Sequence, residues 1–420
     1  MKNKNFHIIG AGLSGLAAGV ALTASGYKST HIYEAAPHAG GRCRSFFDES
    51  LDCLIDNGNH LVLGANKSVF AYLKVIGNET GLQPESPAHF PFLDLVSGET
   101  WDIRPNTGKI PWWIFSPRRR IPNTKWINYL STLSLITASR SATVDKYLGK
   151  NKYMKERLWD PVTRAVLNTE ISSASAKLLW PMVKLTFGGG ELSARPFFTK
   201  EGLGPALITP AIEFIEDNGG KINYGERLKE IIFSANRAEE LIFQNNSHIQ
   251  LSKKDIVIIA VPSNIAPQLL PGIKSPTETR PIVNAHFKLS RIPQRPYSSP
   301  FLGLIGGTVD WIFFRENIVS ATVSAANDLV EENSDNIAKI LWKDISIALN
   351  IEDHSIPPFR IVKEKRATFA QTPNNIKLRP KTKTRWKNIF LAGDWTETHL
   401  PATIEGSIRS GLSAAIMARK

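Results

Sequence analysis

The chain has 420 residues and a formal net charge of +13, with 42% hydrophobic and 21% charged residues. These values exclude a disordered chain, and the length exceeds what one hydrophobic core usually serves, so we expect two joined domains. The positive charge suits nucleic acid, anionic lipid or an acidic substrate. Because neither zinc-finger spacing nor a base-reading basic helix occurs, we expect no nucleic-acid partner.

The two cysteines, Cys43 and Cys53, form neither a CxxC motif nor a metal-ligand cluster. We therefore expect no metal site, no disulfide and a reducing compartment. The first apolar run starts at Phe6 without a signal core before it. No uninterrupted apolar stretch reaches the roughly 20 residues that span a bilayer. These features predict a cytoplasmic protein whose membrane contact is at most peripheral, on the inner face of the cell membrane.

Residues 6–34 have the pattern of a strand, a helix and a second strand. Residues 6–9 are apolar, residues 13–25 are rich in Ala and Leu, and residues 30–33 form a second run closed by Glu34. Gly26 is expected to end the helix. The pattern predicts a βαβ unit with a right-handed crossover.

A glycine motif, Gly10-Ala11-Gly12-Leu13-Ser14-Gly15, joins the first strand to this helix. Gly10 permits the tight turn, Gly12 lets the backbone approach a pyrophosphate, and Gly15 lets the helix pack on the strand. The phosphates then lie at the helix N-terminus, and an acid at the end of the second strand binds ribose hydroxyls. The motif predicts a dinucleotide site formed by Gly10, Gly12, Leu13, Ser14, Gly15 and Glu34.

Two further elements follow. Gly40-Gly41-Arg42 combines close backbone approach with a cation that neutralises phosphate. Its position just beyond Glu34 resembles the flavin amine oxidase and carotenoid desaturase superfamily, which implies FAD rather than NAD. In Asp56-Asn57-Gly58-Asn59-His60, Asp56 and His60 suit proton chemistry, although a structural turn with satisfied polar groups explains the motif equally well. The predicted cofactor contacts are Gly41, Arg42, Gly58, Asn59 and His60, and the candidate catalytic residues are His60 and Asp56.

The middle of the chain has a different texture. Proline and tryptophan are dense from about residue 86 to residue 122, and residues 126–187 are expected to be mainly helical. Trp112-Trp113-Ile114-Phe115 precedes Arg118-Arg119-Arg120. Aromatic side chains suit the headgroup level of a membrane and arginines suit anionic lipid, but a buried tryptophan cluster beside a solvated basic turn explains the segment equally well.

The remaining elements return to a nucleotide-binding pattern. Residues 255–261 suit a strand buried on both faces, and residues 286–289 and 318–323 suit strands of a second sheet. Asn388–Asp394 is predicted to be a strand ending in Gly-Asp, followed by a helix from about residue 402. The carboxylate would hold the ribityl chain of a flavin, and the helix N-terminus would stabilise reduced flavin. The predicted contacts are Gly393, Asp394, Thr403 and Ile404.

Together these elements predict an α/β fold with a Rossmann-like FAD-binding domain and a second, α+β substrate domain. The FAD-binding domain is expected to be discontinuous, from residues 1–85, 200–270 and 365–420. Residues 86–199 and 271–364 would form the substrate- and membrane-facing domain.

The chain resembles the bacterial squalene-associated FAD-dependent enzymes, the hydroxysqualene dehydroxylases of the flavin amine oxidase and carotenoid desaturase superfamily. The resemblance rests on residues 10–19, 40–42, 56–64, 366–370 and 390–411. Its most specific part is Ala392-Gly393-Asp394-Trp395-Thr396 followed by 400–406. Asn59 departs from the glutamine expected in this family, so a contact made there would shift or need a water molecule.

The resemblance implies replacement of the hydroxyl group of hydroxysqualene by hydride from reduced FAD, in squalene and hopanoid biosynthesis. The leaving hydroxide needs a proton donor, for which His60 is the first candidate and Glu191 the second. The allylic cation needs an apolar pocket, for which the aromatic-rich region after residue 86 is a candidate. A second GxGxxG motif is absent from the sequence, so the electron donor is an unidentified protein or a transiently bound nicotinamide.

Two alternatives remain open at this point. One is an oxidase or desaturase of a carotenoid precursor, a porphyrinogen or an amine. The other is a flavin-binding subunit without catalysis that docks on a membrane complex, which the length of the second domain disfavours.

Overall fold

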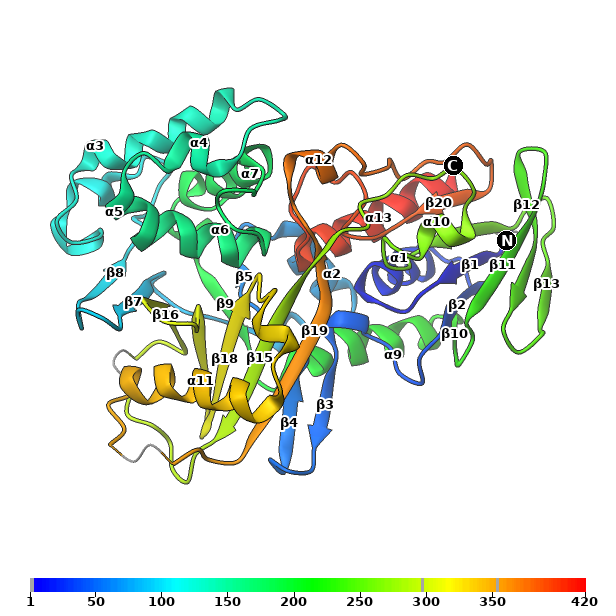
Figure 1. Cartoon of the computed structure of the whole chain (residues 1–420). Coiled ribbons are helices and arrows are strands. Elements are labelled where there is room, and N and C mark those ends of the chain that lie inside the picture. Colours follow the sequence, from blue (N-terminus) through cyan, green and yellow to red (C-terminus); the bar gives the residue numbers. More distant parts are fainter. Residues whose placement is uncertain (1–3, 296–297, 353–354) are drawn as a thin grey trace.

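The computed structural model describes residues 4–295, 298–352 and 355–420. Its nucleotide half contains a five-stranded parallel sheet in the order β10-β2-β1-β14-β20. Segments far apart in sequence thus lie side by side, with Phe6 of β1 opposite Ile256 of β14 (Figure 1). The predicted strands at residues 6–9, 30–33 and 255–261 are confirmed. The five strands are β1 (Phe6–Ile9), β2 (Thr30–Glu34), β10 (Lys221–Tyr224), β14 (Ile256–Ile259) and β20 (Ile389–Leu391).

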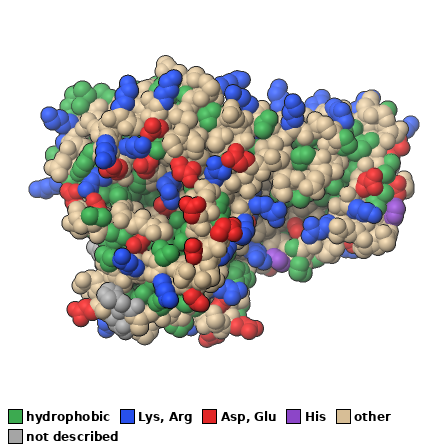
Figure 2. Space-filling model, viewed as in Figure 1, with side chains coloured by type: hydrophobic (Ala, Val, Ile, Leu, Met, Phe, Trp, Pro, Cys, Tyr) green, Lys and Arg blue, Asp and Glu red, His purple; other side chains and the backbone are tan. Residues whose placement is uncertain are grey.

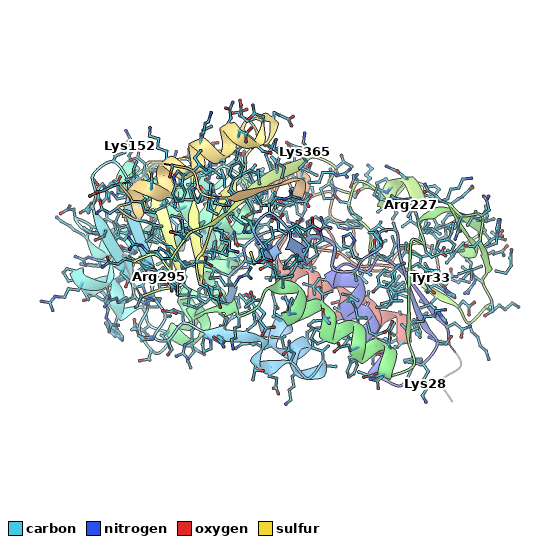
Figure 3. All side chains as sticks on the ribbon, turned by 90° about the horizontal axis from the view of Figure 1, so that it is seen from below. Lys28, Tyr33, Lys152, Arg227, Arg295 and Lys365 are labelled. Atoms are coloured by element: carbon cyan, nitrogen blue, oxygen red, sulfur yellow. The ribbon has the colours of Figure 1, made fainter. Side chains whose placement is uncertain are left out.

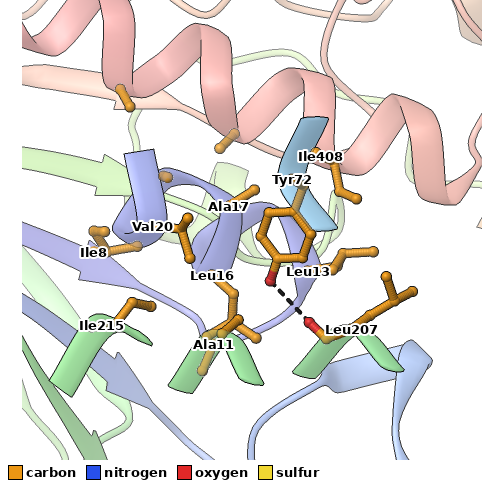
Figure 4. Close-up of a cluster of buried hydrophobic side chains, with 14 of the residues drawn as sticks. Ile8, Ala11, Leu13, Leu16, Ala17, Val20, Tyr72, Leu207, Ile215 and Ile408 are labelled. Atoms are coloured by element: carbon orange, nitrogen blue, oxygen red, sulfur yellow. Dashed lines mark hydrogen bonds between the residues drawn. The ribbon is translucent and has the colours of Figure 1, made fainter. Parts of the chain in front are cut away.

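Helix α1 (Leu13–Thr23) packs between this sheet, α9 (Thr209–Asp217) and the last helix, α13 (Ile404–Arg419). Figure 4 shows the cluster that joins them, with side chains of α1 facing Ile215 of α9 and Ile408 of α13. Tyr72 of α2 (Lys67–Val75) closes the cluster and donates its hydroxyl proton to the Leu207 carbonyl at 2.9 Å. The two helices predicted near residues 13–25 and from residue 402 are both confirmed.

The other half contains a seven-stranded sheet in the order β19-β15-β18-β17-β16-β7-β8. Helix α11 (Ser334–Ala348) packs against one face, where Ile337 and Leu341 contact Val283 and other strand residues. The opposite face, with Phe92 and Trp311, packs against the helical segment. The strands are β7 (Phe90–Asp94), β8 (Thr100–Ile103), β15 (Thr279–Lys288), β16 (Phe301–Ile305), β17 (Trp311–Arg315), β18 (Ile318–Ser324) and β19 (Phe359–Phe369).

The predicted helical segment is confirmed, but it consists of short pieces rather than long helices. Proline and glycine explain part of this, because Pro161 and Pro181 lie within it and Gly149 follows α4. The pieces lie together at the upper left of Figure 1. They are α3 (Trp126–Tyr129), α4 (Val144–Leu148), α5 (Lys152–Met154), α6 (Asp160–Leu167) and α7 (Ala176–Leu185).

Smaller elements connect the two halves. β9 (Pro196–Thr199) pairs with both β5 (Val62–Leu63) and β6 (Leu82–Pro84), and β3 (Ser45–Asp48) pairs with β4 (Cys53–Asp56). A three-stranded sheet, β11 (Leu228–Ser234), β12 (Arg237–Phe243) and β13 (His248–Gln250), lies at the end of the nucleotide half. The short helices are α8 (Glu191–Ala194), α10 (Ala266–Leu269) and α12 (Pro373–Ile376).

The predicted division into domains stays a prediction. β19 (Phe359–Phe369) runs across the expected boundary between residues 364 and 365. In the part of the chain that the structure describes, no helix has both the length and the apolarity needed to cross a membrane.

Candidate active site

A cavity of about 640 Å³ lies at the carboxyl ends of β1, β2, β14 and β20, where ligands of open parallel sheets bind. Figure 3 shows two of its lining residues, Tyr33 and Arg227, on the half of the molecule away from Lys152 and Arg295. The cavity brings together all the predicted cofactor contacts except Gly15. These are Gly10, Gly12, Leu13, Ser14, Glu34, Gly41, Arg42, Gly58, Asn59, His60, Gly393, Asp394, Thr403 and Ile404.

The glycine motif forms a cradle that fits a pyrophosphate. A Cβ atom added to Gly12 would have no heavy atom within 4 Å, so the backbone there faces open space. Gly12 is also the N-cap residue of α1. Because glycine has no side chain, no side-chain hydrogen bond from Gly12 occupies the N–H groups at the start of this helix. Gly15 lies behind the cradle, because a Cβ there would be 1.9 Å from the Gly10 carbonyl oxygen. The glycines therefore leave room and free N–H groups where phosphates bind.

Glu34 is held at the rim of this cradle. Its Oε2 accepts a hydrogen bond from the Ala11 amide at 2.7 Å, and its Oε1 accepts one from the Ala36 amide at 2.9 Å. Both bonds fix the carboxylate at the end of β2, beside the glycine turn. This position fits the predicted contact with ribose hydroxyls.

At the other end of the cavity, Arg42 and Asp394 bind each other. The guanidinium Nη2 donates to Asp394 Oδ1 at 2.9 Å, and Nη1 donates to the Ala367 carbonyl. Asp394 raises the pKa of Arg42 above its ordinary value, so the arginine stays charged. Arg42 thus links residues from the two ends of the chain, and its contact with phosphate stays a prediction.

A second cavity, of about 240 Å³, adjoins the first and is mainly apolar. From the aromatic-rich region after residue 86, Phe90 and Phe92 line this cavity, whereas Trp101 and Trp113 do not. Its apolar lining comes from both sheet and helices: Phe90, Phe92, Ile103, Leu158, Val162, Val166, Leu179, Met182, Val183, Phe187, Trp311 and Phe313. The residues common to both cavities define their junction: Asn59, His60, Ile282, Thr322, Thr368, Ala402, Thr403 and Ile404.

The sequence and fold comparisons agree with this geometry. The family described as flavin containing amine oxidoreductase matches residues 13–416. The chain belongs to this flavin-containing amine oxidoreductase family. A protein from Sinorhizobium fredii named hydroxysqualene dehydroxylase is 41% identical over 99% of this chain and 98% of its own length. Another of that name, from Rhodopseudomonas palustris, is 39% identical over 98% of both chains.

Solved structures share the fold at low sequence identity. Cyclohexylamine oxidase from Brevibacterium oxydans has a TM-score of 0.71 at 14% identity and covers 99% of this chain and 98% of its own. An oxidoreductase from Methanosarcina mazei has a TM-score of 0.72 at 14% identity and covers 98% of this chain and 99% of its own. The predicted fold class, the flavin cofactor and the resemblance to hydroxysqualene dehydroxylases are thereby confirmed, and this member of the flavin-containing family is an oxidoreductase.

His60 lies at the junction. Its exposed surface faces the two cavities. Burial among protein atoms, with a smaller effect of Arg42, lowers its pKa to about 4. The imidazole is therefore uncharged at neutral pH, and it makes no hydrogen bond within the described residues. It suits a neutral hydrogen-bonding group better than the cationic acid that the sequence suggested.

Asp56 and Glu191 have structural surroundings and line neither cavity. Asp56 accepts hydrogen bonds from Ser45 Oγ at 2.5 Å and from the Leu203 amide at 2.8 Å. Burial raises the pKa of Asp56, but its carboxylate serves to hold β3 and β4 against the segment after β9.

Glu191 accepts two hydrogen bonds from Arg195, at 2.9 and 2.8 Å, and one from the Ala88 amide at 2.9 Å. The bonds from Arg195 lower its pKa, so it stays ionised and does not suit a proton donor. The geometry thus corrects both assignments.

Arg379 supports the site from behind the cavity lining, and sequence reasoning missed it. It is 6% exposed and donates hydrogen bonds to the carbonyls of Asp394 at 3.0 Å and Leu400 at 2.8 Å, and to Thr398 Oγ1 at 2.9 Å. It also donates to the Thr396 carbonyl at 2.9 Å. One guanidinium therefore shapes the loop between β20 and α13. An arginine within a run rich in Lys and Arg is typical of a solvated surface, and only the fold reveals its burial.

Two buried histidines near the site predict acid sensitivity. Burial lowers the pKa of His7 and His286 from 6.5 to about 4. As pH falls below 6.5, the unfolded chain binds protons that the folded chain refuses until about pH 4, so stability falls across this window. The two groups together contribute a slope of up to about 2.7 kcal/mol per pH unit. Urea unfolding at pH 7 and pH 5 measures the difference in the free energy of unfolding between the two pH values.

The matched control for this prediction is His248→Asn, because His248 is exposed. We expect His7→Asn to flatten the pH dependence and His248→Asn to leave it unchanged. Equal urea midpoints for the unaltered protein at the two pH values would contradict the prediction.

Proposed function

We propose that the protein is a hydroxysqualene dehydroxylase of squalene and hopanoid biosynthesis, with FAD as its cofactor. The single observation that supports this best is the junction at which the nucleotide cavity meets an apolar cavity. FAD in its reduced form supplies a hydride. The C–O bond of the alcohol breaks, a C–H bond forms at the same carbon, and the hydroxide takes up a proton and leaves as water.

The residues of the chain hold and enclose the reactants. In this proposal the cradle at Gly10 and Gly12 would hold the pyrophosphate and Glu34 would bind ribose. Asp394 would hold the ribityl chain, and the N-terminus of α13 would stabilise the negative charge of reduced flavin. Aromatic and aliphatic side chains of the second cavity exclude water from the allylic cation and offer aromatic faces to it. Residues 1–85, 200–270 and 365–420 would hold the cofactor, and the rest of the chain the substrate.

The test uses purified holoenzyme reduced under anaerobic conditions and mixed with hydroxysqualene. We expect the flavin to reoxidise and squalene to form in equal amount, as measured by absorbance and mass spectrometry. Squalene itself is the matched control and should leave the flavin reduced. Reduction of oxidised enzyme by a carotenoid precursor, a porphyrinogen or an amine, without reaction of hydroxysqualene, would favour the oxidase or desaturase alternative.

We further propose that one apolar patch binds an anionic membrane from which the substrate enters. Trp112, Phe115 and Trp126 are 62%, 48% and 44% exposed, and their rings contact one another with centroid distances of 5.8 and 5.5 Å. The patch continues through exposed aliphatic residues, with exposed basic residues around it. These are Ile110, Ile127, Leu130, Leu133 and Ile136, and Lys109, Arg118, Arg119, Lys125 and Arg140.

The segment contains both buried core residues and exposed aromatic and basic residues. Trp113 and Ile114 are buried core residues, and Arg120 donates a hydrogen bond to the Ile114 carbonyl at 2.7 Å. Hydrophobic and basic side chains are interspersed at the upper left of Figure 2, where Figure 1 shows the short helices. Exposed aromatics with neighbouring arginines suit the interface of an anionic bilayer.

Replacing Trp112, Phe115 and Trp126 together by Ser is expected to reduce binding to phosphatidylglycerol vesicles about tenfold or more. Co-sedimentation measures this. The matched control replaces the exposed residues Val96, Ile232 and Ile292 by Ser, which lie outside the patch. Equal binding by the two triple variants would refute the membrane proposal.

A further inference from the structure

A chain of polar side chains crosses the face of the seven-stranded sheet that is turned towards the cavities. Asn284 of β15 lies opposite Thr322 of β18 in the sheet register. Val283 and Ala285, on either side of Asn284, point into the core beneath α11. Side chains alternate along a strand, so Asn284 faces the other way. Both polar side chains are almost completely buried, at 1% and 7% exposure.

The hydrogen bonds that connect these polar side chains allow only one assignment of donors and acceptors. Asn284 Nδ2 donates to the Asn57 carbonyl at 3.2 Å, which leaves Asn284 Oδ1 as an acceptor. Thr322 Oγ1 donates its single proton to that oxygen at 2.8 Å. Thr322 can therefore only accept from Asn59, whose Nδ2 donates to it at 3.1 Å. This order of donors and acceptors orients the Asn59 amide.

The same junction holds two further polar groups. Thr368 Oγ1 accepts a hydrogen bond from Asn168 Nδ2 at 3.1 Å, so its own proton remains available to the cavities that it lines. The neutral imidazole of His60 lies beside Asn59 and has no partner within the described residues. A polar cluster of Asn59, His60 and Thr368 thus lies at the junction, at one end of a mainly apolar cavity.

We infer that this cluster receives the hydroxyl group of the substrate, and that Thr322 is the positioning residue that orients Asn59 for it. The inference deepens the proposed function and rests on it in taking an alcohol as the substrate. Apolar walls hardly distinguish an alcohol from the corresponding hydrocarbon, whereas a site built to hydrogen-bond a hydroxyl rejects a molecule that lacks it. The cluster therefore makes the alcohol bind more tightly than the hydrocarbon product.

The experiment measures binding without turnover, in oxidised holoenzyme, which has no hydride to give. Hydroxysqualene and squalene are titrated in the same detergent, and the flavin difference spectrum reports their dissociation constants. For the unaltered protein we expect the alcohol to bind at least about tenfold more tightly. Thr322→Val should weaken the binding of the alcohol but not that of squalene, and so bring the ratio of the two dissociation constants close to one. Thr322→Ser should retain the ratio of the unaltered protein.

Two further variants make the result decisive. Thr163→Val is the matched control, because Thr163 is fully buried in α6 but lines neither cavity. It should leave the ratio unchanged. If Thr322→Val does not fold, Asn59→Ala tests the same point without altering the buried sheet. It should also abolish the preference for the alcohol.

Each outcome separates this inference from the proposed function. An unaltered protein that binds both compounds equally would overturn the inference, whether or not it turns over hydroxysqualene. A preference for the alcohol that Thr322→Val and Asn59→Ala leave intact would overturn it as well. A protein that fails to make squalene but shows the Thr322-dependent preference would support the inference and reject the proposed reaction.

Discussion

Gly12→Ala is expected to yield a folded protein that binds FAD more weakly and is purified with less of it. The backbone at Gly12 has φ −69° and ψ 172°, which alanine adopts without strain. The added methyl group would meet no protein atom within 4 Å, so the fold has no reason to change. It would instead occupy the space that the cradle leaves for a pyrophosphate. We expect FAD affinity to fall at least about tenfold, as measured by titration of the apoprotein.

Gly15→Ala is the matched comparison, three residues away on the same turn. Its methyl group would lie 1.9 Å from the Gly10 carbonyl oxygen, so α1 must move away from β1. Such overpacking costs about 1–3 kcal/mol of folding stability, which lowers the urea midpoint even without FAD. If the Gly12 variant bound FAD normally, the cofactor would not lie in the cradle and the site would be assigned wrongly.

Arg379→Met should destabilise the protein by on the order of 3 kcal/mol and remove most of its bound FAD. The substitution preserves much of the side-chain volume but leaves several buried carbonyl groups without their donor, each of which costs about 1–3 kcal/mol. The loop that these carbonyls belong to contains Asp394 and leads into α13. Without the guanidinium, both lose their position at the cavity. Urea unfolding and flavin absorbance after gel filtration measure the two effects.

The control for this variant is Lys381→Met, because Lys381 is exposed and lies in the same basic run. It removes the same charge and is expected to change stability by less than about 0.5 kcal/mol. Arg379→Lys should resemble Arg379→Met, since an ammonium group does not reproduce the planar fork of five donors. Normal flavin content in Arg379→Met would show that the loop holds its shape by other means.

The nucleotide half was largely predictable because its signals are local. A glycine turn between an apolar run and an Ala-rich helix determines the backbone geometry within a few residues, and Glu34 follows at the fixed spacing of a βαβ unit. Asp394 and Thr403 were predictable for the same reason, since a buried strand, a Gly-Asp turn and a helix start are neighbours in sequence.

The substrate half was less predictable because its important contacts are distant in sequence. Thr322 and Asn284 are ordinary strand residues until the sheet register places them opposite each other. Asp56 resembled a catalytic group because it is near His60, but its partners Ser45 and Leu203 were not apparent from spacing. The lining of the apolar cavity depends on how short helices pack against a sheet, which periodicity alone does not specify.

The strand order β10-β2-β1-β14-β20 has a consequence for how the protein is made. The ribosome releases β1 and β2 first and β20 last of these five strands, at about 5–20 residues per second. The central strand therefore waits on the order of tens of seconds for its neighbour β14 and longer for the edge strand β20. Until then the backbone N–H and C=O groups along one edge of β1 lack a partner, so nascent chains would need a chaperone to prevent aggregation, and cofactor loading would be a late event of biogenesis.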